Sequence, residues 1–177
     1  MMNKNHSVDL LQPDIVRDAA FALSWFTRPE GKDTLLRMGN AEHEIPEPSL
    51  KAEKERLAEF IQLEADNKQI TRMINVDGVT IGAVWLELIE MRGVKPPSLH
   101  IMIGNPDYRD IGIGKKVMIE AIEIARSMGY KTIYTRHLTH NTAIKKLNDS
   151  LGFVDDGKPY TDENGLVWRP IKLTLDR

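Results

Sequence analysis

The fold is decided by residues 101–116, which read IMIGNPDYRDIGIGKK. The apolar start predicts a strand, the glycine-containing middle predicts a tight loop, and the residues after it predict a helix that ends at Gly129. Glycines at 112 and 114 let the main chain approach a ligand, and the first turn of a helix offers unpaired N–H groups and the positive end of its dipole. The segment therefore favours a pyrophosphate site. On spacing alone, an ordinary turn with solvated lysines explains it equally well.

Two other phosphate-binding loops do not fit this segment. A P-loop places four residues between its glycines and then continues Gly-Lys-Ser or Gly-Lys-Thr, whereas Gly114 is followed by two lysines. A dinucleotide-binding fingerprint needs a third glycine three residues after the second, and no glycine follows Gly114 at that distance. The sequence excludes both loops.

The hydrophobic pattern on either side predicts alternating strands and helices. Asp77-Gly78 between two strand-like runs indicates a hairpin, because its turn needs positive φ at both central residues. The predicted strands cover residues 8–11, 70–76, 79–86, 99–103 and 131–138, followed by a terminal hairpin over 153–175 around Asn164-Gly165. The predicted helices cover residues 14–26, 33–38, 50–63, 113–128 and 141–151. This order predicts a mixed sheet with helices packed on it, an α/β or α+β fold.

Length and composition narrow the class of protein. A chain of 177 residues predicts a single domain over residues 1–177. It has no cysteine, which excludes a disulfide scaffold, a cysteine-zinc site and a thiol nucleophile. The balance of 24 basic and 26 acidic residues gives no overall field that would favour nucleic acid or an anionic membrane as a partner. Neither a span of ~20 apolar residues nor an apolar N-terminal run is present, so we expect a cytoplasmic protein.

Two motifs together resemble a known family. Arg109-x-x-Gly112-x-Gly114 follows a strand, Asn141 opens a later helix, and residues 151–153 read Leu-Gly-Phe after it. This pattern is similar to the GNAT superfamily of acyl-CoA-dependent N-acyltransferases, over about residues 70–175. Within it, the chain resembles the branch of ribosomal-protein N-terminal, polyamine and aminoglycoside acetyltransferases. The resemblance implies a mixed sheet of about seven strands, splayed between the fourth and fifth and flanked by helices.

The resemblance also implies a coenzyme A site. Main-chain groups at the end of the fourth strand would pair with the pantetheine arm, and main-chain N–H groups of the glycine loop would hold the pyrophosphate. Asn141 would bond the pantetheine, although a plain N-cap would satisfy its side chain equally well. The implied coenzyme A ligands are Met102, Ile103, Gly104, Arg109, Asp110, Ile111, Gly112, Ile113, Gly114, Lys115 and Asn141.

The catalytic acid and base of the family do not carry over. Many members have a tyrosine seven residues after the helix-opening Asn, where this chain has Asn148, and some have a glutamate base where it has Arg136. Asn148 is therefore a candidate for holding a water, and His100 is a candidate base because an imidazole exchanges protons near neutral pH. A half-buried strand histidine is the alternative for His100. His137 and His140 are predicted to be surface or loop-packing residues.

Other side chains offer weaker indications of an acceptor site. Glu87 and Glu90 end the third strand near the expected entrance, although a solvated strand end explains them too. Trp25 and Phe26 could form a wall of the acceptor pocket, with core packing as the alternative. The acidic segment 42–47 favours a cationic amine, unless it is a solvated loop.

The sequence thus predicts an enzyme that transfers acetyl from acetyl-CoA to a primary amine by direct attack on the thioester. No nucleophilic residue and no metal are needed. The acceptor would be a small cationic amine or a protein N-terminus, and the terminal hairpin offers an edge for a homodimer. A non-catalytic acyl-CoA-binding or regulatory module of the same fold is the alternative, because the usual acid is missing.

Overall fold

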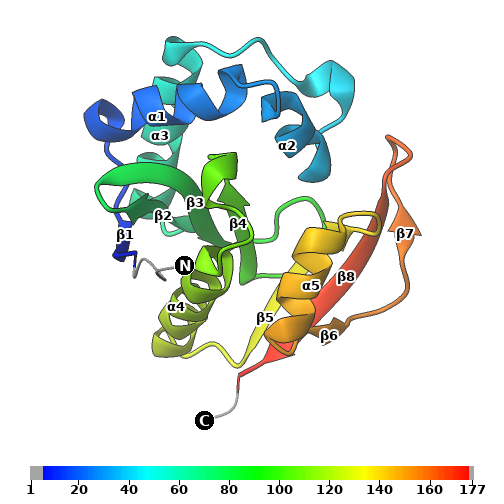
Figure 1. The fold of residues 1–177 in the computed structure, drawn as a ribbon. Helices are drawn as coiled ribbons and strands as arrows, with labels where there is room; N and C mark the ends of the chain where they lie inside the picture. The colour runs from blue at the N-terminus through cyan, green and yellow to red at the C-terminus, as the bar shows by residue number, and fades with distance from the viewer. Residues whose placement is uncertain (1–5, 176–177) are drawn as a thin grey trace.

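The protein, described here by a computed structural model over residues 6–175, has one mixed sheet between two layers of helices (Figure 1). The strands are β1 (Val8–Leu11), β2 (Gln69–Val76), β3 (Val79–Glu87), β4 (Ser98–Ile103), β5 (Thr132–Leu138), β6 (Val154–Asp155), β7 (Tyr160–Thr161) and β8 (Val167–Thr174). The helices are α1 (Ile15–Thr27), α2 (Gly31–Arg37), α3 (Leu50–Ala65), α4 (Ile113–Ser127) and α5 (Thr142–Ser150), with 3-10 turns η1 (Glu42–Glu44) and η2 (Pro106–Tyr108). The predicted mixed fold is confirmed.

The strand order is β1-β2-β3-β4-β5-β8-β6, and β7 also pairs with β8. Every pairing is antiparallel except that of β4 with β5, which is parallel. The described residues form eight strands rather than about seven, because the terminal segment forms two short strands before β8. Gly157, at φ 113°, and Pro159 separate β6 from β7, so one edge of β8 receives both.

Alternation along the strands builds a core on each face of the sheet. Met73 and Ile74 are neighbours on β2 but pack in different clusters, because successive side chains point to opposite faces. Ile74 packs with Val117 and Ala121 of α4, whereas Met73 packs beneath α1 and α3 against Trp25. Helices α1–α3 therefore cover one face, and α4 and α5 cover the other (Figure 1).

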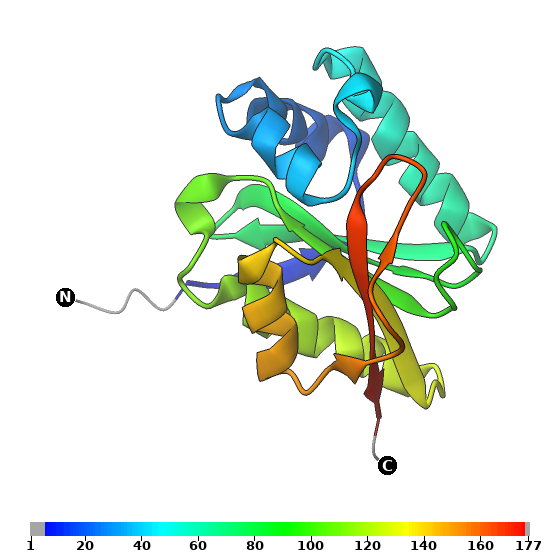
Figure 2. The same ribbon diagram turned by 90° about the vertical axis from the view of Figure 1, so that its right-hand side faces the viewer.

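The parallel pair β4–β5 is where the sheet opens. These strands match at a single register pair, Ser98 with Tyr134, and then diverge toward their C-terminal ends. Figure 2 shows the consequence, since β8 (red) runs steeply across the direction of β2 and β3 (green). The predicted splay between the fourth and fifth strands is thus present, and it leaves main-chain groups near Ile103 without a strand partner on the β5 side.

Candidate active site

A cavity of about 400 Å³ lies where β4 and β5 diverge. Its lining comes from both faces of the sheet. Trp25 and His100 line it from the α1–α3 side, whereas Ile144 and Asn148 of α5 line it from the other side, together with Met118 of α4. The cavity therefore reaches both faces through the gap between the two strands.

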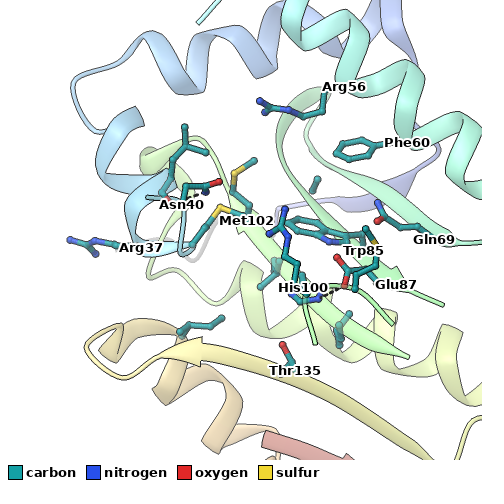
Figure 3. Close-up of a pocket in the computed structure, with 18 of the residues that line it drawn as sticks. Arg37, Asn40, Arg56, Phe60, Gln69, Trp85, Glu87, His100, Met102 and Thr135 are labelled. Atoms are coloured by element: carbon teal, nitrogen blue, oxygen red, sulfur yellow. Dashed lines mark hydrogen bonds and ion pairs between the residues drawn. The ribbon is translucent and has the colours of Figure 1, made fainter. Parts of the chain in front are cut away.

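His100 sits in this cavity within a hydrogen-bonded cluster. Its Nε2 lies 3.0 Å from Ser98 Oγ and 3.3 Å from Glu87 Oε2, and the Ser98 hydroxyl donates to Glu87 at 2.9 Å. The imidazole also stacks on Trp85, with ring centroids 5.5 Å apart. Figure 3 shows Trp85, Glu87 and His100 together on the floor of the cavity, with Arg56 and Phe60 of α3 above them. Because these contacts engage Nε2, the cluster leaves Nδ1 as the nitrogen able to act on a substrate.

The charge of Glu87 supports this arrangement. Burial raises the pKa of Glu87, but the hydrogen bond and charge of His100, helped by Ser98 and Arg92, outweigh burial and leave that pKa below its ordinary value. Glu87 is therefore ionised at neutral pH and places a negative charge beside His100. The alternative of a solvated strand end is wrong for Glu87, which is 7% exposed, while Glu90 is exposed. The antiparallel register of β3 with β4 places Glu87 opposite Ser98 and Trp85 opposite His100.

Trp25 and Phe26 fill both roles that the sequence left open. Both side chains are buried in the core beneath α1 and α3, and both line the cavity. The Trp25 ring also accounts for the glycine at position 104, because a Cβ there would lie 2.3 Å from the ring. The end of β4 can therefore lie against α1 only if residue 104 has no side chain.

The glycine loop presents a row of main-chain donors. Gly112 is the N-cap of α4 with φ 88°, and the first helical bond runs from Lys116 N–H to the Gly112 carbonyl. In the part of the chain that the structure describes, the N–H groups of residues 110–115 donate to no other group. A Cβ at Gly114 would meet only Leu147 Cδ2, at 3.6 Å. These residues fit an anion such as a pyrophosphate.

Arg109 differs from the predicted set. Its main-chain N–H donates to the Pro106 carbonyl at 3.2 Å, so it is already engaged. Its guanidinium donates twice to the Ile103 carbonyl, at 2.8 and 3.0 Å, and once to Thr34 Oγ1 at 2.9 Å. Burial lowers the pKa of Arg109, and Arg37 adds to this effect. The side chain therefore fixes the end of β4 against α2 rather than adding charge beside a pyrophosphate.

Asn141 caps α5 and lines the cavity. Its Oδ1 accepts from Ile144 N–H at 3.3 Å, and its Nδ2 donates to the Arg37 carbonyl at 3.2 Å. The cap that the sequence offered as an alternative role is present. The side chain also ties α5 to the end of α2, and both Asn141 and Arg37 line the cavity.

We expect Asn141→Ala to lower the free energy of unfolding by about 1 kcal/mol through the lost cap, and to raise KM for acetyl-CoA. Asn141→Asp is the matched control, because it keeps the capping oxygen and removes the Nδ2 donor. Thermal unfolding and steady-state kinetics measure the two effects. A lower Tm in Asn141→Ala alone, with KM unchanged in both variants, would leave Asn141 with the capping role alone.

Two buried polar groups that line the cavity on the α5 side lack hydrogen-bond partners in residues 6–175. Asn148 is 2% exposed, and its Oδ1 has no hydrogen-bond partner among the described residues. His137 is 3% exposed; its Nδ1 lies 3.0 Å from the Leu138 carbonyl, and its Nε2 has no partner within the same described range. Both residues line the cavity. The predicted surface position of His137 is wrong, because residues 133, 135 and 137 of β5 alternate onto a buried face; His140 is exposed as predicted.

The acidic segment 42–47 does not contribute to the cavity. Glu42 pairs with Lys32 at 2.5 Å, and Glu44 accepts from the Ala41 N–H at 3.0 Å. The hydrogen bond and charge of Lys32 lower the pKa of Glu42. The lining carries both signs of charge instead, and its ionisable residues besides the histidines are Arg37, Glu53, Arg56, Glu59, Glu87, Arg92 and Arg136. Segment 42–47 is therefore the solvated acidic loop that the sequence offered as the alternative. The arginines come from separate elements, so no sequence motif could group them.

The comparisons identify the family. Residues 35–153 match the model of the acetyltransferase (GNAT) family, so the chain belongs to this family, as its motifs predicted. Acetyl transfer from acetyl-CoA is the general activity of the family. A search of curated proteins gives no significant match.

Solved structures share the fold at low sequence identity. A microcin C7 self-immunity acetyltransferase bound to acetyl-CoA and AMP matches at TM-score 0.78 and 13% identity, covering 95% of this chain and 92% of that one. A ribosomal-protein-S5-alanine acetyltransferase from Vibrio fischeri matches at 0.71 and 17%, covering 98% and 95%. An aminoglycoside acetyltransferase with coenzyme A matches at 0.70 and 17%, covering 95% of each chain.

Residues 6–175 show neither a metal site nor a membrane-spanning helix. No group of three or more His, Asp or Glu side chains there could hold a metal ion. No helix within that range is long and apolar enough to cross a membrane.

Proposed function

We propose that the protein is an N-acetyltransferase that moves acetyl from acetyl-CoA to a primary amine by direct attack on the thioester. The observation that carries this proposal is the cavity that reaches both faces of the sheet between β4 and β5. An amine can enter from the α1–α3 side while a thioester lies in the gap. Direct acyl transfer forms no covalent enzyme intermediate, so the amine and the thioester must be held together in one enclosed space. This cavity provides such a space.

The donor side is supported by the glycine loop. The free N–H groups of residues 110–115 and the start of α4 suit the pyrophosphate, and Lys115 and Lys116 add positive charge nearby. Main-chain groups of residues 102–104 suit the pantetheine arm, because β5 has left this edge of β4. The microcin and aminoglycoside acetyltransferases with the same fold were solved with acetyl-CoA or coenzyme A.

The acceptor side supplies the base. His100 Nδ1 takes a proton from the incoming ammonium, and Glu87 and Ser98 at Nε2 orient the ring and stabilise its charge. The neutral amine then attacks the carbonyl carbon, and a main-chain N–H near Ile103 stabilises the oxyanion. Collapse of the tetrahedral intermediate releases the coenzyme A thiolate.

Thiol release from acetyl-CoA in the presence of a panel of primary amines tests the proposal. The panel contains polyamines, aminoglycosides and peptides with free N-termini, and mass spectrometry identifies the acetylated product. A non-catalytic acyl-CoA-binding module would show a higher Tm with acetyl-CoA yet release no thiol with any amine.

We also propose, from the sequence, that the protein is a single cytoplasmic domain that can dimerise through its terminal hairpin.

We expect Asn148→Ala to lower turnover less than about tenfold. A free thiol has a pKa near ~8.5, so at pH 7 the leaving thiolate is less stable than the protonated thiol by about 1.5 pKa units, roughly 2 kcal/mol. Protonating it during the reaction can therefore gain only this much. The amide of Asn148 has no proton to give at this pH and can only hold a water or orient the sulfur. Steady-state kinetics with acetyl-CoA affinity measured in parallel check this. A thousandfold loss with intact affinity would mean that the amide is essential to the chemistry.

A further inference from the structure

The α5 side of the cavity holds two buried polar atoms that the described protein leaves without partners, His137 Nε2 and Asn148 Oδ1. Leaving a buried polar group unpaired is energetically costly, so such groups require an explanation. They come from adjacent elements, β5 and α5, and both line the space that opens between β4 and β5. A ligand in that space could supply the missing hydrogen-bond partner of each atom.

His137 is held in one orientation. Its Nδ1–H donates to the Leu138 carbonyl at 3.0 Å. This bond fixes the ring orientation and leaves Nε2 as the nitrogen available to a ligand. The main chain of Asn148 is held at the end of α5, where its backbone carbonyl accepts from the N–H groups of Leu151 and Phe153 at 3.1 and 3.2 Å, and its side chain is 2% exposed. Both side chains are enclosed by the protein, so bulk solvent does not supply the missing partners.

His137 and His100 lie on opposite faces of the sheet at the same opening. Ser98 and Tyr134 mark the last paired position, so His100 is two residues beyond it on β4 and His137 is three residues beyond it on β5. His100 faces α1–α3 beside Trp85, and His137 lies on the opposite face, where it lines the cavity together with Asn148 of α5. In acyl transfer the nucleophile and the leaving group occupy different sides of the tetrahedral carbon. One face therefore needs a base and the other an acid.

We propose that His137 Nε2 is the proton donor to the departing sulfur, with Asn148 as a positioning residue beside it. This role rests on the proposed function. The amine nitrogen forms its bond to the carbonyl carbon, the C–S bond breaks, and its electron pair goes to sulfur together with the proton from His137. His100 passes the ammonium proton to solvent before the attack, and it takes the second proton from the same nitrogen as the intermediate collapses. His137 then takes a proton from solvent and His100 gives one up, so no other reactant is required.

Charged neighbours of opposite sign surround His137. Arg169 of β8 lies opposite His137 in the register of β5 with β8. Lys145 lowers the pKa of Asp149 on α5, and the charge of His137 adds a smaller effect in the same direction, so Asp149 is also a neighbour of His137. Arg169 is itself engaged by Asp155 of β6 at 2.6 Å and by Asp149 at 3.6 Å. On this face β4 contributes apolar residues such as Leu99 and Ile101. The carboxylates thus offset Arg169, and an imidazolium at position 137 has a counter-charge.

The test compares His137→Gln with the exposed control His140→Gln, and includes His137→Asn in case the first variant folds poorly. With the amine that the panel identifies, we expect kcat to fall about 10- to 30-fold in the His137 variants, close to the full benefit of protonating a thiolate. The decline of kcat at high pH, where the wild-type acid loses its proton, should disappear. KM for acetyl-CoA should change less than threefold. Unchanged kcat and an unchanged high-pH decline would overturn the proposal.

A second measurement needs no acceptor. Coenzyme A is bound to each protein, and the thiolate absorbance of its sulfur is titrated against pH. If His137 contacts the sulfur, the pKa of the bound thiol should be about one unit higher in the His137 variants than in wild type and His140→Gln. Identical thiol pKa values in all proteins would overturn the proposal. Absence of thiol release by wild type with every amine would instead overturn the proposed function, while the titration would still report on His137.

Discussion

We expect His100→Gln to lower kcat by about 100- to 1,000-fold at pH 7.5 with saturating acetyl-CoA and amine, because a positioned general base contributes about 10²–10⁴ to the rate. Glutamine keeps a polar side chain of similar length on β4 but cannot accept the ammonium proton. The rise of kcat with pH on the acidic side should also vanish, since His100 must be neutral to act. KM for acetyl-CoA should stay within threefold, because His100 lies on the acceptor face.

Two variants make this prediction specific. Glu87→Gln removes the carboxylate that holds the imidazole at Nε2 and should lower kcat less than His100→Gln does, because the proton acceptor itself remains. His43→Gln changes an exposed histidine on η1 and should leave kcat unchanged. If His100→Gln keeps more than a third of the wild-type kcat, the histidine is only a packing residue against Trp85.

We expect Gly114→Val to weaken acetyl-CoA binding by at least about 100-fold, about 2.7 kcal/mol, with little change in Tm. The branched side chain would occupy the space in front of the free N–H groups of residues 110–115, where the pyrophosphate must lie. The fold should tolerate it, because a Cβ there meets only Leu147 Cδ2 at 3.6 Å. Isothermal titration calorimetry and thermal unfolding measure the two quantities.

Gly114→Ala is the graded control and should lose less affinity than valine. Gly112→Val, which the sequence alone would treat as equivalent, is a poorer test. Gly112 has φ 88°, where a β-branched residue is strained, so that variant would lose stability as well as affinity. Acetyl-CoA affinity within threefold of wild type in Gly114→Val would show that this loop does not hold the cofactor.

Local signals in the sequence predicted the elements and the donor side of the site. The Asp77-Gly78 hairpin, the glycine start of α4 and the Asn141 cap each depend on residues close in the chain, and each is found where the pattern places it. The main differences lie at the terminal hairpin. There, two short strands share one edge of β8, and their pairing depends on the position of β8 in the sheet.

The sequence by itself determined the class of fold, the family and the glycine loop, because backbone conformations and periodic burial are dictated by nearby residues. Only the tertiary structure decided which side chains meet in the cavity. Glu87 meets His100 because of the register between β3 and β4, His137 is buried because α5 covers its face of β5, and Arg109 turns back to Ile103. Such contacts join residues through long-range pairing and packing, which carry no signature in the order of the chain.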